Sequence, residues 1–132
     1  MLGRKDYTPE ELAHGRAAVK AQLAAFEALD SPSTDFEALY FTNMVVVLDR
    51  YYVHRIRAVS GKDTNPLNEV ELLCASILDH DRVLTTNKVI KWVPEASVLG
   101  LADGDPIRPS AEEFAALAKA FFAELETRFA PA

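Results

Sequence analysis

Cysteine and long apolar runs are both scarce in this chain, and each absence excludes a class of protein. The 132 residues include one cysteine, Cys74, so the chain cannot form an internal disulfide. No uninterrupted apolar run is longer than residues 44–48 (MVVVL), which is far below the length of a membrane span. Residues 1–12 also lack the apolar core of a secretory signal peptide. These features predict a cytoplasmic protein with no membrane contact.

Basic residues are outnumbered by acidic ones, which gives a net charge of −6 at pH 7. A general nucleic-acid binder carries a basic surface, so no nucleic-acid partner is expected. An apolar fraction of 49% predicts an ordered chain. At 132 residues the chain is long enough for one domain with a buried core. We therefore expect a single helical domain over residues 1–132, with residues 1–7 flexible.

Helix start signals occur at four places along the chain. Residues 8–11, 34–37 and 110–113 have the pattern of a capping box, and Asn65 before Pro66 combines an N-cap with a first-turn proline. With the apolar periodicity, they predict helices over about 9–29, 35–59, 66–80 and 111–129. Residues 81–109 lack such signals and are expected to cover the helices as an irregular segment or short hairpin. The predicted fold class is all-α, a bundle around the second helix.

The second predicted helix is apolar over much of its circumference. Its broad face, spaced at the helical period, comprises Phe41, Met44, Val45, Leu48, Tyr51, Tyr52, Ile56 and Val59. Valines at 46, 47 and 53 add apolar surface at the sides. Such a helix is either central in its domain or covered by a partner subunit. A strand over 44–48 is the competing interpretation, but the helical period on both sides favours a helix.

Cations gather near the end of this helix, within residues 49–69. Arg50, His54 and Arg57 are spaced i, i+4, i+7, which predicts one shared helix face with Asn43. Two arginines beside a histidine could hold a phosphate, and His54 could act as acid or base near neutral pH. The alternative is a solvated or interface face whose arginines pair with the surplus carboxylates.

Arg55 points away from that face and into the apolar stripe, where an isolated charge is very costly. We expect a partly buried ion pair between Arg55 and Glu71 of the third helix, with Glu69 elsewhere on that helix's surface. The alternatives are that Arg55 reaches water at the end of the bundle, or that it binds an anionic ligand.

The turn over residues 61–66 (GKDTNP) leads into the third helix, and a helix N-terminus favours anions. Lys62 and Asn65 are therefore candidate ligand-binding residues. The turn is not a Walker A loop, because the upstream glycine is absent and neither Ser nor Thr follows Lys62. An ordinary capped turn is the alternative.

Signals for a metal or a nucleophile are weak. Asp79, His80 and Asp81 are adjacent, and adjacent residues rarely converge on one ion. We therefore expect no metal and no other cofactor. Cys74 falls on the apolar stripe of the third helix, which predicts an inert buried thiol. That stripe comprises Leu67, Val70, Cys74, Ile77 and Leu78.

Two runs, VHRIRAVSGKDTNPLNEVELL and PEASVLGLADGDPIRPSAEEF, resemble a family of short bacterial proteins of unknown function. The likeness covers about residues 36–129 and implies a bacterial cytoplasmic protein, with no activity or site. The run Arg50-Tyr51-Tyr52-Val53-His54 is similar to the Arg-and-His motif of HEPN domains, helical bundles that often dimerise and include ribonucleases. This likeness implies Arg50 and His54 as catalytic residues. HEPN nucleases place four to six residues between the pair, late in the chain, whereas here three intervene in the second helix.

Two classes of function follow. The first is a non-enzymatic interaction or small-anion-binding module that acts as a homodimer and uses Arg50, His54, Arg57, Lys62 and Asn65. The second is a small enzyme, such as a HEPN-like ribonuclease, that acts on a phosphate-containing substrate. There His54 would be the acid–base group, and Arg50 and Arg57 would hold the anion. The acidic net charge and the lack of a clear base–nucleophile pair favour the first class.

Overall fold

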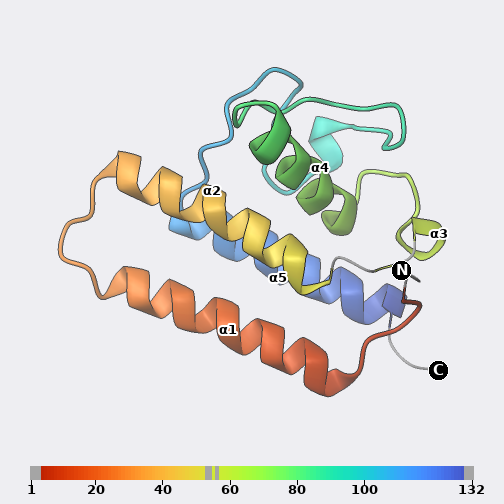
Figure 1. The fold of residues 1–132 in the computed structure, drawn as a ribbon, viewed down its shortest axis with the longest axis horizontal. Coiled ribbons are helices and arrows are strands. Elements are labelled where there is room, and N and C mark those ends of the chain that lie inside the picture. Colours follow the sequence, from red (N-terminus) through yellow and green to blue (C-terminus); the bar gives the residue numbers. More distant parts are fainter. Residues whose placement is uncertain (1–3, 53–54, 56, 130–132) are drawn as a thin grey trace.

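The computed structural model describes residues 4–52, 55 and 57–129 of the chain. Its helices are α1 (Pro9–Glu27), α2 (Thr34–Tyr51), α3 (Arg57–Ser60), α4 (Pro66–Asp79), the 3-10 turn η1 (Pro94–Ala96) and α5 (Ala111–Phe129) (Figure 1). Among these residues there is no strand, and the bridges Arg4–Arg55 and Val83–Pro106 are isolated. The predicted all-α class is confirmed, and residues 81–109 are irregular apart from η1.

Most helices begin at the predicted caps. The capping boxes at 8–11 and 110–113 form in both directions, and Asn65 accepts a hydrogen bond from the N–H of Asn68 at the start of α4. α1, α4 and α5 therefore follow their predicted ranges closely. At α2 the cap is Ser33 and not Thr34, because the Ser33 hydroxyl accepts from the N–H of Phe36.

α2 ends at Tyr51, well before the predicted end at residue 59. Tyr52 leaves helical geometry, with φ −134° and ψ 39°. Two side chains cap its carbonyl: Arg55 Nη1, three residues later, donates to it at 2.8 Å, and the hydroxyl of the distant Tyr7 donates to it at 3.4 Å. Tyrosine and valine at positions 51–53 have modest helix propensity, so a tertiary cap is enough to end the helix there.

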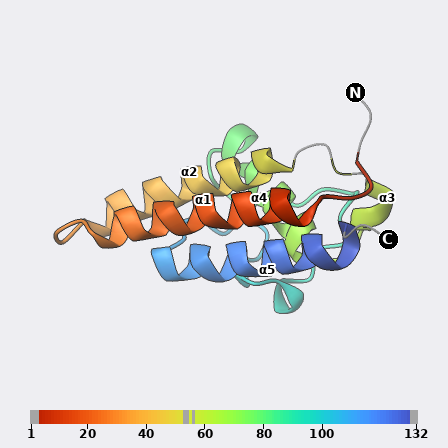
Figure 2. The ribbon, with the colours of Figure 1, turned by 90° about the horizontal axis from the view of Figure 1, so that it is seen from below.

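α5, rather than α2, occupies the centre of the bundle. α5 packs against each of α1, α2, α3 and α4. Its buried residues are Phe114, Leu117, Ala118, Phe121, Phe122, Leu125 and Phe129. In Figure 1, α2 lies in front of α5, and Figure 2 shows α2 along the upper edge with α5 along the lower edge. α2 buries one face against α4 and α5. Its opposite face is exposed at Phe36, Leu39, Asn43 and Arg50 and half-buried at Tyr40, Val46 and Val47.

The segment before α1 joins the core in part, although residues 1–7 were expected to be flexible. Tyr7 is 2% exposed, and its N–H donates to the carbonyl of Phe129 at 2.7 Å. The Tyr7 ring also packs edge-on against Tyr52, with ring centroids 4.9 Å apart. Residues 1–3 lie outside the described part of the chain.

Segment 81–109 covers α4, as predicted. It contributes buried side chains to the core at Leu84, Ile90 and Ile107. Glu69 of α4 anchors it: this residue is 1% exposed, and its carboxylate accepts from the N–H groups of Val98 at 2.7 Å and Leu99 at 2.9 Å. The predicted surface position of Glu69 is therefore wrong. α4 is buried on two sides, by the bundle and by the cover.

Because the cover segment also packs on α4, the buried residues of this helix differ from the predicted apolar stripe. Leu72 and Leu73 are buried, whereas Leu78, expected in the stripe, is 58% exposed near the end of the helix. Within residues 4–52, 55 and 57–129, no helix combines the length and apolar composition required to cross a bilayer.

Candidate functional site

The predicted cationic face does not lie on one helix. Arg50 is exposed in the last turn of α2, whereas Arg57 begins the separate helix α3. His54 and the side chain of Arg57 fall outside the described part of the chain. Because α2 ends at Tyr51, the i, i+4, i+7 spacing creates no shared helix face. Of the three candidates, Arg50 is the one that can be placed, on the open face of α2.

Arg55 has two acidic neighbours. Its Nη2 lies 2.9 Å from Asp49 Oδ1 and 3.8 Å from Glu71 Oε1, and the Arg55 side chain is 4% exposed. The guanidinium also lies over the Phe121 ring, with Cζ 5.6 Å from the ring centroid. Arg55 Nε is buried and has no hydrogen-bond partner among the described residues. The sequence prediction named Glu71 and not the nearer partner, Asp49. An aspartate within an otherwise apolar helix could have indicated such a buried pair.

The turn before α4 is used to build the fold. Lys62 is exposed, and its carbonyl accepts from the N–H of Lys91 at 2.7 Å. Asn65 is 5% exposed; its amide donates to the carbonyl of Ser60 and its oxygen accepts from Asn68. The Asn65 carboxamide is therefore occupied at both ends by the chain itself, and this turn joins α4 to the cover segment.

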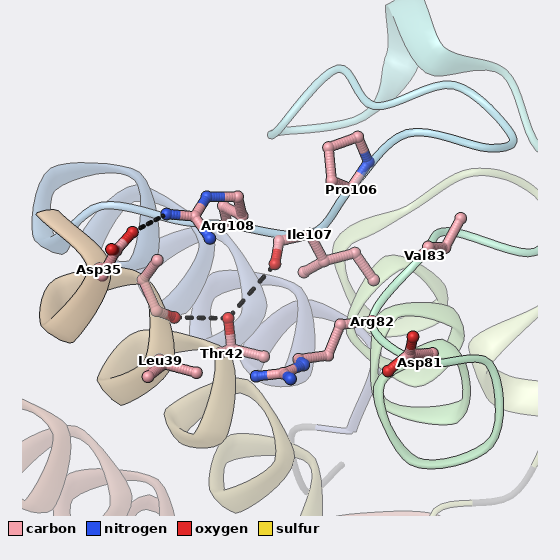
Figure 3. A pocket seen from close by; sticks show the side chains of 10 residues that line it. Asp35, Leu39, Thr42, Asp81, Arg82, Val83, Pro106, Ile107 and Arg108 are labelled. Carbon is pink, nitrogen blue, oxygen red and sulfur yellow. Dashed lines mark hydrogen bonds and ion pairs between the residues drawn. The ribbon is translucent and has the colours of Figure 1, made fainter.

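A hollow of about 500 Å³ opens between α2 and the cover segment (Figure 3). Arg82 enters it from the turn after α4 and Arg108 from the stretch before α5, and both lie around Thr42 in this view. Arg108 Nη2 pairs with Asp35 Oδ1 at 2.8 Å, with both side chains largely exposed. Among the described residues, no carboxylate lies within ion-pair distance of Arg82. Apolar walls come from Leu39, Val83, Pro106 and Ile107.

The backbone holds Arg82 in an uncommon conformation. Asp81 and Arg82 both have positive φ, 52° and 61°, which is the left-handed region. The N–H of Arg82 donates to the carbonyl of Ser76, and its own carbonyl accepts from Ile107. Neither arginine of the hollow was predicted as a site residue. The sequence did contain a signal for Arg82. No glycine follows the third predicted helix, so a residue with a side chain must take the left-handed conformation that often ends a helix.

The open face of α2 is the second candidate. We call it the α2 stripe, and it comprises Phe36, Leu39, Tyr40, Asn43, Val46, Val47 and Arg50. Phe36 is 44% exposed and Leu39 53% exposed, although both are large and apolar. Phe36 is held in place by stacking on Phe26 and Tyr40. A hollow of about 580 Å³ runs along the stripe and reaches Ile77 of α4.

Metal and thiol chemistry find little support in the described residues. No group of three or more potential metal ligands converges within residues 4–52, 55 and 57–129. Cys74 is buried, and burial raises the pKa of its thiol to about 11. A thiol with that pKa is almost entirely protonated at neutral pH and is a poor nucleophile.

Comparisons with known proteins bring no further information about the site. A scan against protein-family models finds no match, and searches of curated proteins and of solved structures find none either. The likenesses to short bacterial proteins and to HEPN domains stay predictions.

Proposed function

We propose that this chain is a self-associating interaction module in which two copies pack through the α2 stripe. The observation that carries the proposal is the exposure of Phe36 and Leu39 on a helix whose other face is in the core. Clustered, exposed apolar side chains are typical of interaction sites. An apolar helix is either central or covered by a partner. Since α5 has the central place, coverage by a partner accounts for the stripe.

A second copy fits because the stripe is self-complementary. Asn43 lies at its centre, and the other members form pairs at equal separations on either side: Phe36 with Arg50, Leu39 with Val47, and Tyr40 with Val46. A two-fold axis through Asn43, with antiparallel α2 helices, would place each pair in contact across the interface. Arg50 of one copy would then lie over the Phe36 ring of the other, a favourable cation–π arrangement.

Charges at the two ends of the stripe support the same register. Asp35, which pairs with Arg108 of its own copy, borders its N-terminal end with a side chain that is 87% exposed, and Arg50 lies at its C-terminal end. Antiparallel packing brings these opposite charges together twice, once at each end. Parallel packing would bring like charges together instead, which is unfavourable.

The size of the stripe sets the expected affinity. A standard dimer interface buries about 800 Å² per partner, more than one helix face provides. Ile77 and Val83, which border the hollows beside the stripe, would add to the buried area. We therefore expect a reversible dimer with a dissociation constant in roughly the micromolar range.

Sedimentation equilibrium on the wild type and two matched variants tests this function. Leu39→Glu places a charge in the apolar part of the stripe and should give a monomer at concentrations where the wild type is dimeric. Val89→Glu is the control, because Val89 is similarly exposed, at 50%, but lies in the cover segment. Neither change should affect the urea midpoint. A wild type that stays monomeric up to about millimolar concentration, or equal behaviour of the two variants, would contradict the proposal.

A further inference from the structure

We infer that the hollow around Arg82 and Arg108 binds a small organic phosphate. The two arginines that would bind the phosphate lie outside the α2 stripe, although the hollow shares Leu39 with the stripe. Two guanidinium groups enter the hollow from segments far apart in sequence, the turn after α4 and the stretch before α5 (Figure 3). Guanidinium groups bind phosphate oxygens through paired, charge-assisted hydrogen bonds.

The position of Arg82 requires an explanation beyond turn formation. Glycine would take a φ of +61° without steric cost, whereas arginine there is strained. Backbone hydrogen bonds on both sides, to Ser76 and from Ile107, fix this residue firmly. Strained residues held by their surroundings concentrate at functional sites. Here the fixed backbone places an arginine along a hollow; Arg82 is exposed and has no acidic partner among the described residues.

Two aspartates also border the hollow, Asp35 and Asp81, and the ligand must compete with them. The pair between Asp35 and Arg108 is solvent-exposed, with side-chain exposures of 87% and 52%. Exposed pairs contribute little to stability, so exchanging Asp35 for a phosphate has a low cost. A phosphate monoester carries up to two charges and three acceptor oxygens, so it can engage both arginines at once.

The size and walls of the hollow indicate more than a bare phosphate. A volume of about 500 Å³ falls in the range of small-molecule sites. Leu39, Val83 and Ile107 provide an apolar surface beside the arginines. The ligand class that fits is a phosphate group attached to a small apolar body.

Amide shifts followed by NMR at constant ionic strength test this, with phenyl phosphate as the probe. We expect saturable shifts at Arg82, Ile107 and Arg108, and weaker binding of inorganic phosphate, which lacks the ring. Phenol, which lacks the phosphate, should not bind. Absence of saturation with phenyl phosphate, or equal shifts with phenol, would overturn the inference.

Arg82→Gly separates binding from folding. The variant removes the guanidinium and relieves the strained φ, so it should bind phenyl phosphate at least about tenfold more weakly while its thermal midpoint does not fall. Arg82→Asn provides a second test, because asparagine also tolerates the left-handed conformation. Lys119→Ala, on the exposed side of α5, is the control for general charge effects. Unchanged affinity in the folded Gly or Asn variant would exclude Arg82 from the site and overturn the inference.

Discussion

Asp49 and Arg55 form the most buried ion pair in the described part of the chain, with a separation of 2.9 Å and side-chain exposures of 12% and 4%. The pair bridges the end of α2, since Asp49 lies in its last turns and Arg55 beyond it. Arg55 also donates to the carbonyls of Tyr52 and Leu67. One guanidinium thus caps α2, neutralises a buried carboxylate and reaches α4.

Double-mutant cycles should rank the two acidic partners of Arg55. Arg55→Met alone leaves Asp49 as a buried, unpaired charge, and we expect a loss of about 3–5 kcal/mol in the free energy of unfolding. Adding Asp49→Asn should recover much of that loss. The coupling with Glu71 should be smaller, since that contact is 3.8 Å and the Glu71 side chain is 38% exposed. Urea denaturation measures both couplings. A coupling with Glu71 as large as that with Asp49 would contradict this ranking.

The sequence predicts local features of this fold better than the end of α2. Caps such as Thr8 and Asn65 act within a few residues of their helices, so their pattern is visible in sequence. The end of α2 depends on Tyr7, which reaches the Tyr52 carbonyl through tertiary structure, and on Arg55, whose guanidinium turns back onto the same carbonyl from three residues later. A periodicity continuing to residue 59 carries no information about such a cap.

The candidate site follows the same rule. The cationic face expected around Arg50 rested on a helix extending to residue 59, and α2 ends at Tyr51, so a shared helix face no longer supports it. His54 and the side chain of Arg57 lie outside the described part of the chain.

Arg82 and Arg108 line one hollow because the two ends of segment 81–109 pair with each other, through the Val83–Pro106 bridge and the hydrogen bond from the Ile107 N–H to the Arg82 carbonyl. Because the two arginines are far apart in sequence, no local pattern predicts that they lie close together. The apolar sides of α2 were visible in sequence, but their exposure depends on α5 taking the central place.

Gly15 is required by a close approach of two helices to α1. A Cβ at this position would lie 2.4 Å from the Tyr52 hydroxyl oxygen and 2.8 Å from the Phe122 ring. Gly15→Ala should therefore destabilise the fold by about 1–3 kcal/mol. The sign is diagnostic, because glycine to alanine at an open helix position stabilises by about 1 kcal/mol.

Thermal or urea unfolding measures this effect, with two comparisons. Ala17→Gly, at an exposed position of α1, should lose about 1 kcal/mol and shows the ordinary helix response. Tyr52→Phe should relieve part of the clash in the Gly15→Ala background, since it removes the hydroxyl. A Gly15→Ala variant more stable than wild type would contradict the packing described here.

Glu69 should make stability decrease as pH rises. Burial raises the pKa of its carboxyl above the ordinary value of 4.5, even though two N–H groups oppose that shift. Because the folded state binds this proton more tightly than the unfolded state, the contribution of Glu69 is fully present below pH 4.5. It is lost as pH rises through the raised folded-state value.

Glu69→Gln isolates this contribution. The difference between wild-type and variant unfolding free energies, followed from pH 4 to 8, should carry the predicted slope. The amide is a weaker acceptor, so the N–H groups of Val98 and Leu99 should exchange with solvent faster in the variant. The variant should lose about 1–3 kcal/mol in the free energy of unfolding at pH 4 and less at pH 8. Unchanged exchange at both amides would contradict the anchoring role of Glu69.

Glu11 should show the opposite pH dependence. The hydrogen bond from Arg4, followed by the one from the Thr8 backbone, lowers the pKa of this carboxyl from 4.5 to about 2. Its stabilising contribution is therefore present above pH 4.5 and is lost as pH falls towards 2. A carboxyl-detected NMR titration should show the pKa rising in Arg4→Ala. Thr8→Ala keeps the backbone N–H donor to Glu11, so the rise there should be smaller, and a larger one would contradict Arg4 as the main cause.

Cysteine cross-linking should define the register of the proposed dimer. With a two-fold axis through Asn43, the two copies of residue 43 meet, whereas the two copies of residue 36 lie roughly 21 Å apart along the helices. Asn43→Cys should therefore cross-link to itself with a short bis-maleimide, and Phe36→Cys should not. Phe36→Cys mixed with Arg50→Cys should cross-link, because those positions face each other. The native Cys74 is buried, with its pKa raised to about 11, and should stay unmodified. Efficient cross-linking of Phe36→Cys to itself would indicate parallel packing and contradict this register.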